Sequence, residues 1–153
     1  MSAVSPEHAS RGAGRAIETP FGSTVVEPGD EVSFPSGIPG FEACRRFVVL
    51  SPQGLGGFSC LHALEGPAAS FFVIDPRRAV AQYHCAVSQN DLQRLGATPD
   101  TVLLWLALVS FDDEGRAYAN LRAPIVINPE RMLGYQVMPH NSLYPLRHPL
   151  ASE

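Results

Sequence analysis

The sequence feature that most constrains the fold is a short β-branched run enclosed by two prolines. Ile125, Val126 and Ile127 lie between Pro124 and Pro129. Valine and isoleucine have restricted χ1 rotamers and suit the pleated surface of a sheet, whereas proline lacks the N–H that a sheet ladder needs. The run is therefore predicted to form one short buried strand that ends close to both prolines.

Polar residues flank this strand on both sides. Asn120 and Arg122 precede it and Asn128 follows it, and all three side chains can bind backbone groups or a partner. None of them is a nucleophile or an efficient general base at neutral pH. The stretch from Ala119 to Pro129 therefore indicates a surface held in one shape and gives no sign of catalysis.

Short apolar runs separated by proline- and glycine-containing turns recur along the chain, as in all-β proteins. Residues 46–50, 70–74 and 83–87 are examples of the expected strands. The apolar run 102–110 contains Trp105 and is expected to be the central strand, buried on both faces. About nine short strands at close spacing predict an all-β barrel or sandwich.

One short helix is expected between two of these strands. Ser88 is a favourable N-cap, and Asp91 places an acid near the free N–H groups of the first turn. Leu92 and Leu95 share one face at the i, i+3 spacing, and Gly96 provides a C-terminal stop.

The chain length of 153 residues suits one domain with a full core. Residues 1–16 lack the apolar stretch of a signal peptide and are expected to form a flexible tail before a single domain at residues 17–150. No apolar run approaches the ~20 residues of a membrane-spanning helix. Three cysteines without a C-x-x-C pair fit reduced thiols. These features predict a cytoplasmic protein that does not bind membranes.

Charge is distributed unevenly along the chain. The net charge is −4 and no lysine is present, which excludes Schiff-base lysine chemistry. Residues 115–150 contain four arginines and one acid, whereas residues 20–44 contain no base and four acids, Glu27, Asp30, Glu31 and Glu42. Overall acidity disfavours direct nucleic-acid binding and favours a basic protein partner.

Signals for catalysis or metal binding are weak. Neighbouring residues of a strand point to opposite faces, so His84 is poorly placed to activate Cys85. Four of the five histidines are considered as metal ligands and lack zinc-type spacing; they are His62, His84, His140 and His148. No cofactor or metal is expected. A thiol enzyme that uses Cys85 or Cys60 is one alternative, and a barrel that carries a small apolar ligand is another.

Two irregular segments carry residue types found at interfaces. The loop from Pro35 to Phe41 is expected to expose Ile38 and Phe41 at least in part, either as a structural corner or as a binding loop. The tail from Pro139 to Leu150 contains three prolines and should be irregular. Its polar and aromatic residues could anchor a partner or dock on the barrel itself; they are Asn141, Tyr144, Arg147 and His148.

Five stretches appear in a distinctive order. They are Thr19 to Gly22 (T-P-F-G), Phe34 to Glu42 (F-P-S-G-I-P-G-F-E), Phe72 to Pro76 (F-V-I-D-P), Ala119 to Asn128 (A-N-L-R-A-P-I-V-I-N) and Tyr144 to Leu150 (Y-P-L-R-H-P-L). Together they resemble the FliW flagellar assembly factors, from about residue 17 to residue 150. The resemblance implies a small β-barrel-like domain of about nine short strands with one short helix, and a non-enzymatic role.

The resemblance also implies two protein partners. Members of the family bind CsrA, a small basic RNA-binding dimer, and stop it from repressing translation of flagellin messenger RNA. They also bind flagellin, so free flagellin withdraws the inhibitor. We expect the acidic N-terminal half to face CsrA. We expect Ile38 and Phe41, with Tyr144 and Arg147 nearby, to contact flagellin.

The protein is expected to act as a monomer. The residues expected to contact partners come from the five motif stretches and from the acidic segment, residues 20–44. They are Glu31, Phe34, Ile38, Phe41, Glu42, Asn120, Arg122, Asn128, Tyr144, Arg147 and His148.

Overall fold

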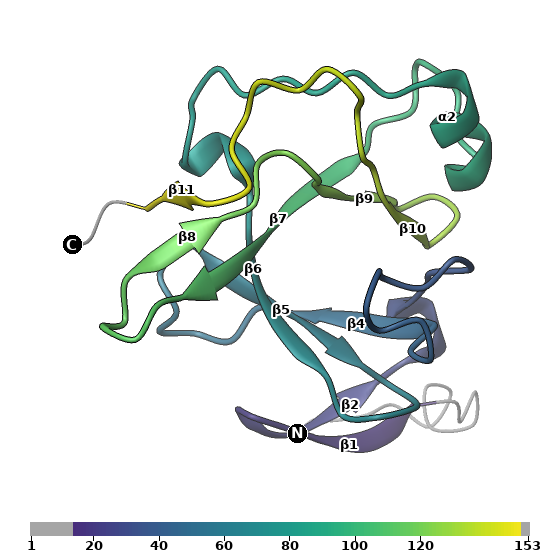
Figure 1. Ribbon diagram of the computed structural model, residues 1–153. Helices are drawn as coiled ribbons and strands as arrows, with labels where there is room; N and C mark the ends of the chain where they lie inside the picture. The colour runs from purple at the N-terminus through teal and green to yellow at the C-terminus, as the bar shows by residue number, and fades with distance from the viewer. Residues whose placement is uncertain (1–13, 151–153) are drawn as a thin grey trace.

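The computed structural model describes residues 14–150, and almost all of its regular structure is β (Figure 1). The strands are β1 (Arg15–Thr19), β2 (Gly22–Val26), β3 (Glu31–Ser33), β4 (Arg46–Leu50), β5 (Phe58–Ala63), β6 (Ser70–Ile74), β7 (Leu104–Phe111), β8 (Ala117–Ala119), β9 (Ile125–Asn128), β10 (Leu133–Gln136) and β11 (His148–Pro149). The helical elements are α2 (Gln89–Leu95) and two 3-10 turns, η1 (Pro28–Asp30) and η2 (Pro76–Arg78).

Seven strands close into a barrel. Their order is β7-β6-β5-β4-β3-β10-β9, and β9 pairs back with β7 through Trp105 opposite Val126. Neighbouring strands are antiparallel except β3 and β10, which run parallel and meet at the pair Ser33 and Leu133. The all-β prediction is thus confirmed, and the barrel replaces the sandwich alternative.

The interior of the barrel is filled by side chains. Phe34 and Phe47 are completely buried and pack edge to face with ring centroids 5.2 Å apart. Residues 125–127 are at most 2% exposed and lie in the short strand β9. The buried strand predicted between the two prolines is therefore confirmed. A barrel that carries a small ligand needs an interior cavity, and that alternative stays a prediction.

The helix signals are confirmed. The hydroxyl of Ser88 accepts the N–H of Asp91, and the Asp91 carboxylate accepts the N–H of Ser88, which makes a capping box. Gly96 ends α2 in the left-handed conformation, with φ 61°, which glycine adopts without steric penalty.

Two strand predictions need correction. Residues 83–87 form no strand, because no other strand lies beside them within residues 14–150. The run predicted at 102–110 becomes β7, and it is not buried on both faces. Leu104 is 42% and Phe111 49% exposed, and within β7 only Leu106 and Ala107 are buried.

The two ends of the predicted domain also differ from expectation. β1 begins at Arg15, two residues before the predicted start, and pairs with β2 as a separate hairpin. Residues 1–13 of the predicted tail lie outside the described part of the chain. At the other end, His148 and Pro149 form β11, which pairs with β8 in a tail predicted to be irregular throughout.

Candidate functional site

Several exposed apolar side chains lie on an irregular segment, residues 138–147, which we call the strap. The strap crosses one end of the barrel, between the Pro35–Phe41 loop and the chain that leads into α2 (Figure 1). Three large apolar side chains on it face solvent; Met138 is 55%, Leu143 98% and Leu146 53% exposed. Such a concentration of exposed apolar side chains is typical of a docking surface.

Tyr144 fixes the strap to the barrel. Its ring packs against that of Tyr83 at a tilt of 34° with centroids 4.6 Å apart, and its hydroxyl accepts the N–H of His84 at 3.1 Å. Its backbone carbonyl accepts Nε of Arg122 at 2.9 Å. Tyr144 therefore has a structural role in this conformation, as the self-docking interpretation of the tail predicted.

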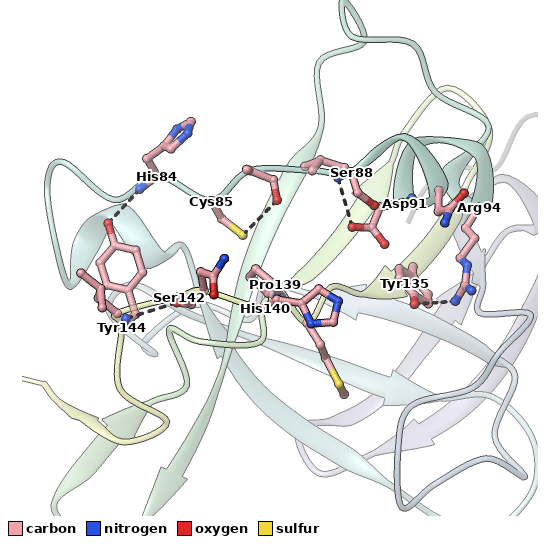
Figure 2. A pocket seen from close by; sticks show the side chains of 16 residues that line it. His84, Cys85, Ser88, Asp91, Arg94, Tyr135, Pro139, His140, Ser142 and Tyr144 are labelled. Atoms are coloured by element: carbon pink, nitrogen blue, oxygen red, sulfur yellow. Dashed lines mark hydrogen bonds between the residues drawn. The ribbon is translucent and has the colours of Figure 1, made fainter.

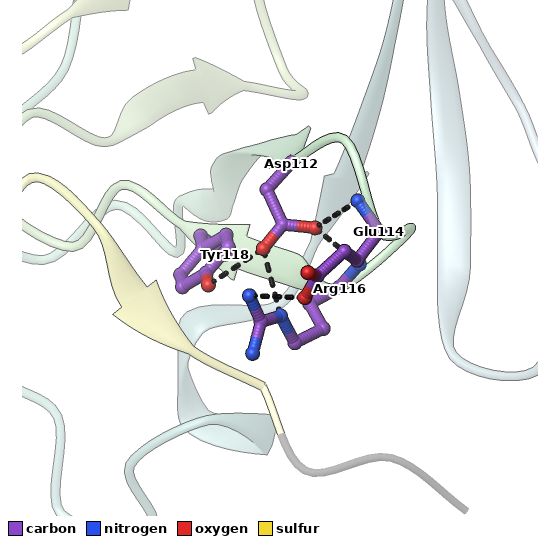
Figure 3. A network of polar contacts seen from close by, with 4 residues as sticks. All are labelled: Asp112, Glu114, Arg116 and Tyr118. Carbon is purple, nitrogen blue, oxygen red and sulfur yellow. Dashed lines mark hydrogen bonds and ion pairs between the residues drawn. The ribbon is translucent and has the colours of Figure 1, made fainter.

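The end of the tail is held in the same way. Arg147 lies over the ring of Tyr118 at 4.1 Å, and His148 pairs with Ala119 in the β11–β8 ladder. Figure 3 shows the polar network that Tyr118 forms with the turn between β7 and β8. The Asp112 carboxylate accepts the N–H groups of Glu114 and Arg116, Nε of Arg116 and the hydroxyl of Tyr118. These hydrogen bonds lower the pKa of the Asp112 carboxyl to about 2, and the bond from the backbone N–H of Arg116 has the largest effect.

A groove of about 910 Å³ separates the strap from the chain that leads into α2, and we call it the α2-side groove. Figure 2 shows His84, Cys85 and Ser88 on one wall and Pro139 to Tyr144 on the other, with Arg94 and Tyr135 at the far end. Arg94 donates to the Tyr135 hydroxyl, and its guanidinium lies 4.8 Å from the centre of that ring.

A second groove, of about 360 Å³, lies on the other side of the strap and is mostly apolar; we call it the loop-side groove. Phe41 of the Pro35–Phe41 loop lines it, 44% exposed and edge to face with Phe71 at 4.9 Å. Leu146 and Met138 line the strap side, and Arg122 is also part of the wall. Met138 and Pro139 line both grooves, so the strap is their shared wall.

Two apolar residues expected to contact partners are buried instead. Phe34 is 0% and Ile38 1% exposed, so the expectation of an exposed Ile38 is wrong. The loop folds back on itself where the N–H of Phe41 donates to the Ile38 carbonyl at 2.7 Å, and Ile38 lies in the barrel core. Of the apolar pair expected to meet flagellin, only Phe41 presents its side chain to solvent.

The polar residues around the buried β9 strand hold backbone in place. Asn128 is 1% exposed and binds the C-terminal end of α2. The carboxamide of Asn120 accepts the N–H groups of Arg122 and Ala123. In this conformation Asn128 has no surface to offer a partner, whereas Arg122 is exposed at the loop-side groove.

One of the four acids in the segment 20–44 forms ion pairs with arginines that lie outside this segment. Glu31 forms ion pairs with Arg15 at 3.8 Å and with Arg46 at 3.7 Å, although no base lies near it in the sequence between residues 20 and 44. Glu42 is exposed and accepts the N–H of Gly40, which lowers the pKa of its carboxyl.

The two cysteines considered as nucleophiles lie in poor surroundings for a thiolate. Cys60 is 2% exposed, and burial raises the pKa of both the Cys60 and the Cys85 thiols. No group of three or more His, Cys, Asp and Glu side chains gathers as a metal site within residues 14–150. No helix of that part of the chain is long and apolar enough to cross a membrane.

We expect Cys85 to react slowly with iodoacetamide at pH 7, more slowly than free cysteine, because a raised pKa reduces the thiolate fraction. Mass spectrometry of the native protein over time measures the rate, and the urea-unfolded protein is the control. Alkylation of native Cys85 as fast as in the unfolded chain would revive the thiol-enzyme alternative.

Sequence reasoning missed Met138, Leu143, Leu146 and Arg94 as surface candidates. A signal was available for Leu143 and Leu146. Large apolar residues in a proline-bounded segment too irregular to build a core tend to remain exposed. For Arg94 no signal existed, because its role depends on Tyr135 from β10, which is distant in sequence.

The fold and this surface define a class of protein: a small closed β-barrel with two adjoining surface grooves. Comparison with known proteins then gives the family. Residues 15–150 match the family described as FliW protein. The flagellar assembly factor FliW of Geotalea uraniireducens is 33% identical over 88% of this chain and 83% of its own length. That of Thermotoga maritima is 32% identical over 89% and 93%.

The structural comparison agrees. A crystal structure of the flagellar assembly factor FliW superposes with a TM-score of 0.82 at 32% identity, covering 91% of this chain and 99% of that one. The chain belongs to the FliW family of flagellar assembly factors, as the five sequence stretches indicated.

Proposed function

We propose that this chain is a cytoplasmic regulator of flagellin supply that binds flagellin and CsrA and transforms no substrate. When bound to CsrA it relieves repression of flagellin translation, and free flagellin competes for it. One observation carries this proposal. A member of the FliW family presents an apolar groove, lined by Phe41, Met138 and Leu146, beside a fixed strap.

The loop-side groove is the proposed flagellin contact. The ends of flagellin are amphipathic helices, and such helices bind grooves that accept their apolar side chains. Phe41 is a rigid aromatic side chain, the residue type that dominates binding energy at interfaces. Arg122 on the groove wall can meet an acid at the edge of the helix.

Phe41→Ala is expected to weaken flagellin binding about tenfold or more, measured by isothermal titration with purified flagellin monomer. Phe111→Ala is the matched control, since Phe111 is similarly exposed and likewise packs edge to face on a phenylalanine, but on the β7–β8 side. Circular dichroism verifies folding. Equal losses in the two variants, or none in Phe41→Ala, would show that flagellin does not use this groove.

The proposed CsrA contact is made by the acidic residues of the segment 20–44, which are Glu27, Asp30, Glu31 and Glu42. Glu31 is engaged by Arg15 and Arg46, so we assign the larger part to Glu42, which is exposed. Negative charge placed there attracts a basic partner and repels RNA phosphates near the complex.

Glu42→Arg is therefore expected to weaken CsrA binding and to flatten its salt dependence, measured by titration at 50 and 300 mM salt. Asp113→Arg makes the same charge change at an exposed position in the turn between β7 and β8 and should leave both quantities unchanged. An unaltered affinity and salt slope in Glu42→Arg would remove this surface from the proposal.

A further inference from the structure

The α2-side groove runs between two segments whose backbone amides lack partners. The N–H groups of Cys85, Ala86 and Val87 on one wall make no hydrogen bond to any residue from 14 to 150. On the opposite wall the same holds for Met138 and for residues 140–143. Backbone N–H and C=O groups are strong hydrogen-bonding groups that normally find partners. A groove with such walls is suited to bind another backbone.

The wall from His84 to Val87 has the character of an edge strand. No turn or bend interrupts it between Tyr83 and Ser88, and exposure alternates along it. His84 and Ala86 are exposed, whereas Cys85 and Val87 are half-buried. The sequence pattern predicted a strand here, and what the fold lacks is a neighbouring strand. An unpaired edge of this kind is a template for another chain.

The arrangement of the unpaired backbone N–H groups along Cys85 to Val87 favours an extended ligand over a helical one. A helix satisfies its own backbone, so a helix in this groove would leave the N–H groups of Cys85 to Val87 without partners. An extended peptide on one side of the segment pairs with alternate N–H groups, and its own alternate side chains point into and away from the groove. The N–H of His84 points to the strap, where it donates to Tyr144, so that of Ala86, two residues on, is the one expected to face the groove. At about 910 Å³ the groove has room for several side chains.

The charges of the groove indicate an acidic ligand. Arg94, His84 and His140 line it. Asp91 is the one acid among its described lining residues, and its carboxylate accepts the N–H of Ser88 at the start of α2. The Asp91 carboxylate is therefore engaged at the helix cap. Arg94 is the cationic side chain of the groove, because the His84 ring points away from the strap (Figure 2).

We propose that the α2-side groove binds an extended, acidic peptide segment of another protein by strand addition along His84–Val87. The site is separate from the loop-side groove, so it does not depend on the proposed flagellin and CsrA contacts. Because Met138 and Pro139 belong to both grooves, a peptide bound here contacts the wall that a ligand of the loop-side groove also contacts.

The test is selection of peptides from a random dodecapeptide phage library on the full chain. We expect enriched peptides to alternate apolar and other residues and to contain Asp or Glu. The best one, synthesised with a fluorescent label, should lose about tenfold or more in affinity for Ala86→Pro, which lacks the amide N–H. Ala86→Ser retains the N–H and should bind within about twofold of the original protein. Arg94→Glu should bind the peptide more weakly.

Amide hydrogen exchange keeps the test valid if Ala86→Pro does not fold by circular dichroism. In the unaltered protein the bound peptide should slow exchange at Cys85, Ala86 or Val87. Absence of enrichment, peptides with i, i+3 and i+4 apolar spacing, unchanged affinity in a folded Ala86→Pro protein, or binding without slowed exchange would each overturn the proposal. Failure of Phe41→Ala to affect flagellin has no bearing on these measurements, so the two proposals fail separately.

Discussion

Asn128→Ala is expected to lower the free energy of unfolding by about 2–3 kcal/mol. Asn128 is 1% exposed, and its Nδ2 donates to the carbonyls of Leu95 at 2.8 Å and Gly96 at 3.3 Å. Its Oδ1 accepts the N–H of Glu130 at 3.0 Å. Alanine would leave these groups of α2 and of the turn after β9 without partners, in a place that water hardly reaches. Urea unfolding followed by Trp105 fluorescence measures the loss.

The matched control is Asn90→Ala, which removes the same side chain from an exposed position on α2 and should change stability by less than about 0.5 kcal/mol. Amide exchange gives a second readout. Because Asn128 anchors the C-terminal end of α2, exchange of α2 amides should accelerate more than that of β5 amides. Equal unfolding midpoints for Asn128→Ala and Asn90→Ala would contradict this assignment and leave a contact role for Asn128 open.

Much of the secondary structure could be predicted because its signals are local. The strands at 46–50 and 70–74 and the capped helix after Ser88 depend on residues within a few positions of one another. Closure of the barrel could not be predicted in this way. It depends on β7 meeting β9 and on β3 meeting β10, contacts between distant segments that no local pattern specifies.

The candidate site was predictable only in part, for a related reason. Proline and glycine in the Pro35–Phe41 loop indicated a surface turn, but not which side chain the turn directs inward. Gly37 has φ 68°, and a Cβ there would lie 2.8 Å from Cα of Glu42, so the loop closes tightly on itself. That closure buries Ile38 and leaves Phe41 exposed. Exposure in a compact loop is thus set by backbone geometry as well as by composition.

Residues 83–87 were predicted as a strand from their local sequence but have no neighbouring strand within residues 14–150. The predicted strand does not form, although exposure alternates along the segment in the folded chain. Strand formation also needs a neighbour, and the segment has none within the described chain. A sequence pattern reports which surface a segment can cover, whereas pairing depends on what the rest of the chain brings beside it.

Gly134→Ala is expected to destabilise the protein by about 3 kcal/mol, which for a domain of this size lowers Tm by about 6–12 °C in calorimetry. A Cβ at Gly134 would lie 2.7 and 2.8 Å from the two Cε atoms of Phe34. The Phe34 ring is completely buried and packed on Phe47, so it has no room to withdraw. Gly134 lies in β10, beside the Ser33–Leu133 pair that joins β3 and β10, so the displacement would strain the closure of the barrel.

Two comparisons separate this crowding from a general effect of losing a glycine. Gly29→Ala places a methyl group where no heavy atom lies within 4 Å and should leave Tm nearly unchanged. Phe34→Leu combined with Gly134→Ala should be more stable than the sum of the two single changes, because the smaller side chain makes room for the new methyl group. If the two effects simply add, or if Gly134→Ala melts with the original protein, the contact between Gly134 and Phe34 does not limit the stability of the barrel.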